Sequence, residues 1–145
     1  ATADLWADAG RLPATVFLGA AEPRPGGDYS NVIVTVTPTG SQIVYRQRTP
    51  VPIGMWHPWR EDSAIAHWAG PGGFELGGAR YGALICFEQL LIWPVLQTCA
   101  ARPSLVLAPT NAWWSKDTSV PGIQESVVTA WARLFAVPVV TAYNY

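Results

Sequence analysis

The sequence predicts an α/β fold with a mixed sheet, whose C-terminal half is a β-α-β-α-β series. Three short apolar segments typical of buried strands alternate with two longer segments whose apolar residues recur at helical spacing. We expect the strands at residues 80–86, 104–108 and 138–142, and the helices at residues 88–101 and 123–135. Because each helix connects two strands, these strands should pair in parallel.

The N-terminal half is predicted to supply a short helix, one strand and a β-hairpin. Residues 7–11 are typical of the end of a helix, and residues 15–19 of a strand that ends at a glycine. Residues 22–28, dense in Pro and Gly, indicate a loop. Residues 31–36 are β-branched almost throughout, and residues 42–47 return after a Pro-Thr-Gly-Ser turn, which predicts the hairpin.

The stretch from 49 to 78 is the least regular part of the chain. Its prolines break any helix and its glycines mark turns, and a long loop of this kind is usually functional or mobile. It carries Trp56, Trp59 and Trp68, three of the eight tryptophans in the chain. These side chains are candidates to line an apolar groove or to form an interface, which includes an interface between copies in a homo-oligomer.

Composition bounds the possible functions. Half of the 145 residues are hydrophobic and 13% are charged, which suits one domain with a substantial core. A net charge of -1 argues against a nucleic-acid partner. No apolar run reaches the ~18 residues that a membrane span needs. His57 and His67 lack a third ligand at useful spacing, so we expect no metal and no cofactor.

Cys86 is the main candidate for chemistry. The apolar strand stops at this cysteine, directly before the predicted helix, and ligands of open α/β sheets bind at that edge. A thiol that faces a helix N-terminus is expected to favour the thiolate. A buried, inert thiol is the alternative, and Cys99, inside the helix, is interpreted in that way. Glu88 either complements the helix dipole or contributes to catalysis.

Four segments resemble a known family. Residues 85–88 resemble the Ile-Cys-Tyr-Glu nucleophile motif of the nitrilase (carbon-nitrogen hydrolase) superfamily, and their surroundings resemble its apolipoprotein N-acyltransferase branch. Residues 45–54 are similar to that branch's Tyr and Lys segment followed by Leu-Val-Pro-Phe-Gly, residues 111–113 to its Asn-Asp-Ala-Trp loop, and residues 132–140 to its helix ending in Arg-Pro-Val-Val. Residues 46–59 resemble TraB-type conjugal transfer proteins more than that branch.

The resemblance implies that residues 1–145 are a fragment of a nitrilase-like α-β-β-α sandwich, one domain truncated at both ends. It also implies a Glu-Lys-Cys triad, in which the cysteine attacks an acyl carbon, the glutamate is the base and the lysine stabilises the oxyanion. Cys86 matches the nucleophile and Glu88 the carboxylate of the same motif. Phe87, Asn111 and Trp113 are the corresponding substrate-binding candidates, and the substrate class is a small amide or acyl compound.

Two triad members depart from the family pattern. The family's base would precede residue 1, and the lysine position falls on Gln47, which is therefore the third catalytic candidate. Gln47 can donate a neutral hydrogen bond to an oxyanion but brings no charge; a solvated strand residue is its alternative. Arg46 and Arg48 should point to the opposite, solvated face if strand alternation continues.

Three functional hypotheses follow. The first, which we favour, is an amide hydrolase or N-acyltransferase that acts through a thioester on Cys86, within a conjugal transfer protein; the segment alone should be inactive. The second is a degenerate nitrilase-like binding domain, and the third is an assembly module based on the Trp-rich loop. The segment is expected to be soluble, while the resemblance places the whole protein at the bacterial inner membrane, with this domain in the periplasm. The sequence alone does not fix the compartment.

Overall fold

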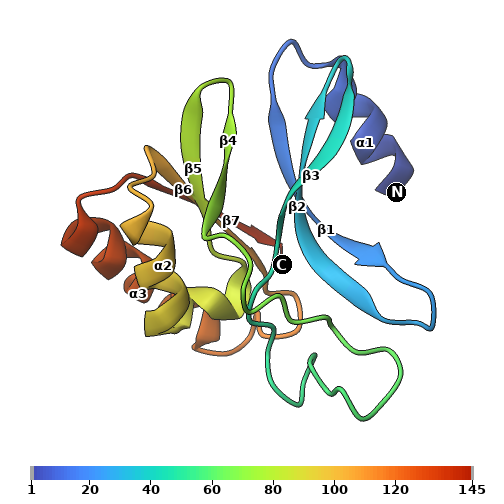
Figure 1. The fold of residues 1–145 in the computed structure, drawn as a ribbon, viewed down its shortest axis with the longest axis vertical. Helices are drawn as coiled ribbons and strands as arrows, with labels where there is room; N and C mark the ends of the chain where they lie inside the picture. The colour runs from blue at the N-terminus through green and yellow to red at the C-terminus, as the bar shows by residue number, and fades with distance from the viewer. Residues whose placement is uncertain (1, 145) are drawn as a thin grey trace.

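The structure, a computed structural model that describes residues 2–144, contains two β-sheets packed face to face with helices on both outer sides (Figure 1). The first sheet is antiparallel, in the order β1-β2-β3. Its strands are β1 (Val16–Pro23), β2 (Tyr29–Thr37) and β3 (Gly40–Arg46). α1 (Thr2–Arg11) covers its outer face. The predicted N-terminal helix and the β-hairpin are thus confirmed.

The second sheet is mixed, in the order β4-β5-β6-β7. β4 and β5 form an antiparallel hairpin, whereas β5, β6 and β7 are parallel, as the crossover helices predicted. The strands are β4 (Gly73–Leu76), β5 (Ala79–Ala83), β6 (Leu105–Asn111) and β7 (Val139–Asn144). The helical segments of this half are the 3₁₀ helix η1 (Cys86–Leu90), α2 (Ile92–Ala100) and α3 (Val120–Phe135).

Alternating side chains along β2 create two separate core layers. Ile33 faces the space between the sheets, where it packs with Tyr45, Ala83 and Leu107. Its neighbours Val32, Val34 and Val36 point the other way and pack against Ala9 of α1. A third cluster, from Leu84, Val95 and Val106, fills the layer between the second sheet and its helices. The resulting α-β-β-α sandwich confirms the predicted fold.

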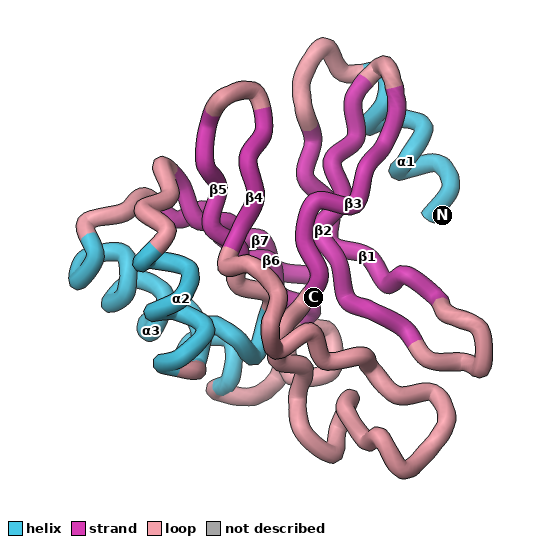
Figure 2. The backbone as a smooth tube through the Cα atoms, in the orientation of Figure 1, coloured by secondary structure: helices cyan, strands magenta, loops and turns pink. Residues whose placement is uncertain are grey.

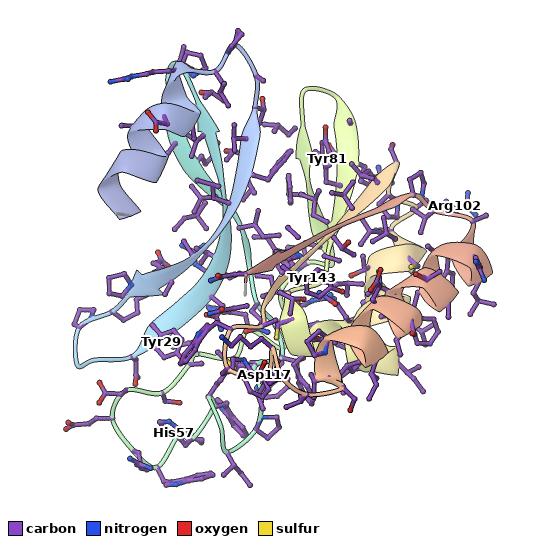
Figure 3. All side chains as sticks on the ribbon, turned by 180° about the vertical axis from the view of Figure 1, so that it is seen from behind. Tyr29, His57, Tyr81, Arg102, Asp117 and Tyr143 are labelled. Carbon is purple, nitrogen blue, oxygen red and sulfur yellow. The ribbon has the colours of Figure 1, made fainter. Side chains whose placement is uncertain are left out.

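Aromatic rings fill one end of the space between the sheets. The ring of Tyr81, labelled in Figure 3, stacks on Phe74 at a centroid distance of 5.3 Å and contacts Phe17 of the opposite sheet at 5.4 Å. Burial of apolar surface stabilises a fold by roughly 25 cal/mol per Å². These rings therefore help to hold the two sheets together.

Two predictions about strands are corrected. β1 does not stop at residue 19, because it pairs with β2 along its whole length as far as Pro23. β4 lies inside the stretch predicted to be irregular, and Gly77 and Gly78 form its turn, with φ values of 58° and 78° that suit glycine. The rest of that stretch, between β3 and β4, is a loop, as expected (Figure 2).

The helix predicted for residues 88–101 is interrupted. η1 ends at Leu90, Leu91 is extended, and α2 begins at Ile92. Pro94 explains the break, because it lacks an N–H and is tolerated only in the first turn of a helix. The residues that follow β5 therefore form a separate 3₁₀ turn.

Gly82 of β5 lies where the sheet packs tightly on α2. A methyl group there would come within 2.6 Å of Cγ2 of Thr98 and 3.0 Å of Cγ2 of Val106. Gly82→Ala should therefore lower the free energy of unfolding by about 1–3 kcal/mol, measured by denaturant or thermal unfolding. Gly122→Ala, in α3 where no atom lies within 4 Å, is the matched control and should leave stability unchanged or raise it by up to about 1 kcal/mol.

Candidate active site

Cys86 lies at a strained turn between β5 and α2. It is the first residue of η1, and its φ of 49° falls in the left-handed region, which costs a non-glycine residue about 1–2 kcal/mol. Such strain persists only where the surrounding contacts enforce it. The side chain is half-buried. The turn thus presents a thiol at the end of the second sheet, as the sequence predicted.

The expected activation by a helix N-terminus is wrong. η1 has five residues in a 3₁₀ conformation, and α2 starts only at Ile92. Burial raises the pKa of the Cys86 thiol above its ordinary value, and the nearby Glu88 charge adds slightly to this rise. The amide of Gln124 and the backbone N–H groups of Phe87 and Asn111 act in the opposite direction and lower the pKa.

Glu88 is fully buried behind the turn, and both oxygens of its carboxylate accept hydrogen bonds. Oε2 accepts a bond from the Ile85 N–H at 2.7 Å, and Oε1 accepts one from the Arg48 N–H at 2.8 Å. The hydroxyl of Tyr45 lies 3.0 Å from both oxygens, and the Thr49 N–H lies 3.3 Å from Oε1. Burial raises the pKa of Glu88, while the charge of Arg48 and the bonds from Ile85, Arg48 and Tyr45 lower it. The carboxylate thus ties η1 to the end of β3.

The solvated position predicted for Arg48 is wrong, because only 1% of its surface is exposed. β3 ends at Arg46, so strand alternation no longer governs the direction of Arg48. Its Nε donates to Tyr45 Oη at 2.8 Å and lies 3.5 Å from Glu88 Oε1, while Nη2 donates to Thr98 Oγ1 at 2.8 Å. Arg46, in contrast, is partly exposed and pairs with Glu22.

Gln47 lies beside the Cys86 turn and is buried rather than solvated. Its Nε2 donates to the carbonyl of Ile85, the residue before Cys86, at 2.9 Å. Its Oε1 accepts a bond from Nδ2 of Asn31 at 2.7 Å. An amide nitrogen carries two N–H groups, so one donor of Gln47 is not used by the Ile85 contact. The structure therefore brings the side chain of Gln47 next to the turn that carries Cys86.

A hollow of about 430 Å³ adjoins this turn. It is lined by residues of β1, β2, β6 and β7 together with Ile85. The uncharged polar residues of its wall are Asn31, Thr110, Asn111, Tyr143 and Asn144. Cavities of this size accommodate small molecules.

The substrate-binding candidates lie at different distances from this hollow. Asn111 is exposed at its edge, and its Oδ1 accepts a bond from Asn144 Nδ2 at 3.2 Å. Phe87 follows Cys86 and is half-buried. Trp113 is 61% exposed and does not line the hollow. The substrate-binding roles of all three stay predictions.

Gln124 is the site residue that the sequence analysis missed. It lies in α3, 2% exposed, with Nε2 at 3.8 Å from Sγ of Cys86. A glutamine in an amphipathic helix carries no local signal of its role, because the contact depends on how α3 packs. In the described part of the chain, no three His, Cys, Asp or Glu side chains are grouped to hold a metal. His57 lies on the loop that projects from the two sheets (Figure 3).

A comparison with family sequence models identifies the family of the chain. Residues 26–133 match the sequence model of the carbon-nitrogen hydrolases. The chain belongs to this family. The match includes the Cys86 turn, Gln47 and Gln124, so the site described above lies within the part of this carbon-nitrogen hydrolase chain that the model covers.

Two curated relatives are conjugal transfer proteins. The chain is 44% identical over 135 residues to the conjugal transfer protein TraB of Agrobacterium fabrum and 42% identical to a probable TraB of Sinorhizobium fredii. Each alignment covers 90% of this chain but only 32% and 35%, respectively, of the relative. The chain thus spans about a third of the length of these relatives, and residues 2–144 contain no helix with the length and hydrophobicity needed to cross a bilayer.

Solved structures share the fold at low identity. A carbon-nitrogen hydrolase from Helicobacter pylori superposes with a TM-score of 0.74 at 16% identity, over 97% of this chain and 49% of that protein. An amidase from Nesterenkonia superposes with a TM-score of 0.69 at 19% identity, over 97% of this chain and 50% of the amidase. At these identities the likeness shows the fold alone.

Removal of either charge from the buried Arg48–Glu88 pair should leave the other uncompensated. Arg48→Met and Glu88→Gln should each lower the free energy of unfolding by about 3–5 kcal/mol, and the double variant should lose less than the sum. A double-mutant cycle by denaturant unfolding measures this coupling. Glu75→Gln, which removes an exposed partner of Arg80, is the control and should change little. Strict additivity at Arg48 and Glu88 would contradict the pairing.

Because burial raises the pKa of Cys86, its thiolate should form at a higher pH than that of an unstructured cysteine. We expect the rate of alkylation by iodoacetamide, followed on the Cys86 peptide by mass spectrometry, to rise with pH and to reach half-maximum above the midpoint of a cysteine peptide. A midpoint below that of the peptide would show instead that the turn activates the thiol.

Proposed function

We propose that this chain is the nucleophile-bearing part of an amide hydrolase or N-acyltransferase domain within a conjugal transfer protein. The observation that carries the proposal is the placement of Cys86. Its thiol lies half-buried on a strained turn, under the influence of three N–H donors. The membership of the carbon-nitrogen hydrolase family and the likeness to TraB proteins support the two parts of this proposal.

In the proposed reaction, Sγ of Cys86 attacks the carbonyl carbon of an amide, and the thiol proton passes to a base. The C–S bond forms, the C–N bond breaks and the amine leaves with a proton. Water or a second amine then attacks the thioester and releases Sγ. We place the base in a segment outside residues 1–145. The second amide N–H of Gln47 is the proposed neutral donor to the oxyanion.

A structural neighbour supports cysteine chemistry on this fold. In a mutant of the Nesterenkonia amidase, the acetamide moiety of fluoroacetamide is covalently attached at the active site cysteine. For the present chain, a comparable adduct on Cys86 is part of the proposal. The uncharged carboxamides of Asn31, Asn111 and Asn144 favour a neutral amide substrate over a charged one.

One specific observation favours the alternative of a degenerate binding domain. Gln47 takes the position of the family's lysine, and both ends of its amide are engaged, by Ile85 and Asn31. A neutral amide stabilises an oxyanion less than an ammonium group does. A domain of this kind would keep the hollow and bind an amide without forming the thioester.

Mass spectrometry of the full-length protein separates these functions. After incubation with fluoroacetamide and with a panel of amide and acyl-lipid donors, we expect an adduct on the Cys86 peptide and none in Cys86→Ser. Gln47→Lys should raise the rate of adduct formation roughly tenfold or more, because it adds positive charge beside the turn. Cys99→Ser is the control and should leave the adduct unchanged.

The absence of any Cys86 adduct in both the natural protein and Gln47→Lys would overturn the enzymatic proposal. Retained binding of an amide ligand under those conditions would favour the degenerate binding domain. An adduct that forms only in Gln47→Lys would show that the turn is competent and that the replacement of the lysine is what silences it.

A further inference from the structure

Gln124 is held against the Cys86 turn by two contacts on one face of α3. Its Nε2 lies 3.8 Å from Sγ of Cys86, and Nε1 of Trp131 donates to the carbonyl of Gln89 at 3.0 Å. Residues 124 and 131 are two helical turns apart and therefore lie on the same face. Val128, between them, is also buried. Thus α3 docks on η1 along a stripe that directs the Gln124 amide to the sulfur.

The amide of Gln124 is sealed from solvent and aimed at a group that needs a donor. Only 2% of Gln124 is exposed, so solvent has little access to the amide. A sulfur atom is a weak acceptor as a thiol and a much stronger one as a thiolate. The 3.8 Å contact therefore strengthens when the proton leaves Sγ. Phe87 and Asn111 contribute the other two N–H groups, but both are backbone groups and are fixed by the fold.

Charged side chains do little to stabilise the thiolate of Cys86. The charged groups on η1, at or just after the end of β3, on α3 and on the loop before α3 are Glu88, Arg46, Arg48, Glu125, Arg133, Lys116 and Asp117. Arg46 pairs with Glu22. Glu88 acts on the thiol and opposes its ionisation. Glu125 and Arg133 line a separate hollow of about 380 Å³ against β7, and α2 and β6 carry no charged residue. Neutral N–H groups are therefore what favours the thiolate here.

We propose that Gln124 is a positioning residue, whose amide N–H fixes the direction of the Cys86 side chain and stabilises its thiolate. The residue acts through Cys86 and need not touch substrate. The inference rests on the proposed role of Cys86 as a nucleophile, yet it concerns the ionisation of the thiol, which is measurable without any acyl donor. It assigns to α3, 38 residues further along the chain, a part in setting the reactivity of the turn.

The test is the pH profile of Cys86 alkylation by iodoacetamide in the full-length protein, read on the Cys86 peptide by mass spectrometry. Gln124→Met removes the donor at similar volume and should raise the pH midpoint and slow alkylation near pH 7 about tenfold. Gln124→Glu places a carboxylate against the sulfur and should raise the midpoint further. Gln42→Glu, at an exposed strand position, is the matched control and should leave the profile unchanged.

Cys99 provides an internal monitor of folding, because it is half-buried in α2. A loss of structure would speed its alkylation together with that of Cys86, whereas the proposed effect slows Cys86 alone. Unchanged Cys86 midpoints in both Gln124 variants, or faster alkylation of both cysteines, would overturn the positioning role. A raised pH midpoint of Cys86 in the Gln124 variants, without any acyl adduct on Cys86, would refute only the enzymatic function. An acyl adduct together with unchanged midpoints would refute only the role of Gln124.

Discussion

The buried ion pair between Glu88 and Arg48 is the interaction on which the arrangement of the site depends. Two charges removed from water cost several kcal/mol each, and the structure offsets this with a nearly complete set of hydrogen bonds. Arg48 extends from the end of β3 to Thr98 of α2, and Glu88 collects the backbone N–H groups of Ile85 and Arg48. One network therefore joins the first sheet, η1 and α2.

This network explains how a strained cysteine can persist at a turn. The left-handed backbone of Cys86 is unfavourable in isolation, but Glu88, two residues later, is fixed to Ile85 on the other side of it. Glu88 thus anchors the turn through its hydrogen bonds, while Sγ of Cys86 lies near the backbone N–H groups of Phe87 and Asn111 and the amide of Gln124. Anchor and candidate nucleophile are separated by a single residue.

Membership of the carbon-nitrogen hydrolase family gives the fold, but the properties of this member lie in its departures from the family pattern. A neutral Gln47 stands where the family resemblance leads one to expect a lysine, and it is held between Asn31 and Ile85. The surroundings of Cys86 are correspondingly dominated by neutral donors, with Glu88 as the charge that acts on the thiol. Since fold does not determine function, the function of this domain has to be tested at Gln47 and Cys86.

The sequence by itself determined the α/β class, the hairpin, the parallel pairing of β5, β6 and β7, and the position of Cys86 after a buried strand. Period-2 and period-3.6 patterns report which face of an element is apolar. The family resemblance also predicts that Gln47 takes the lysine position of the motif. Only the tertiary structure decided the burial of Arg48, the 3₁₀ conformation of η1 and the contact between Gln124 and Cys86. Arg48 lies beyond the end of a strand, η1 is separated from α2 near a proline, and Gln124 and Cys86 are distant in the chain. Local periodicity carries no information in any of these three cases.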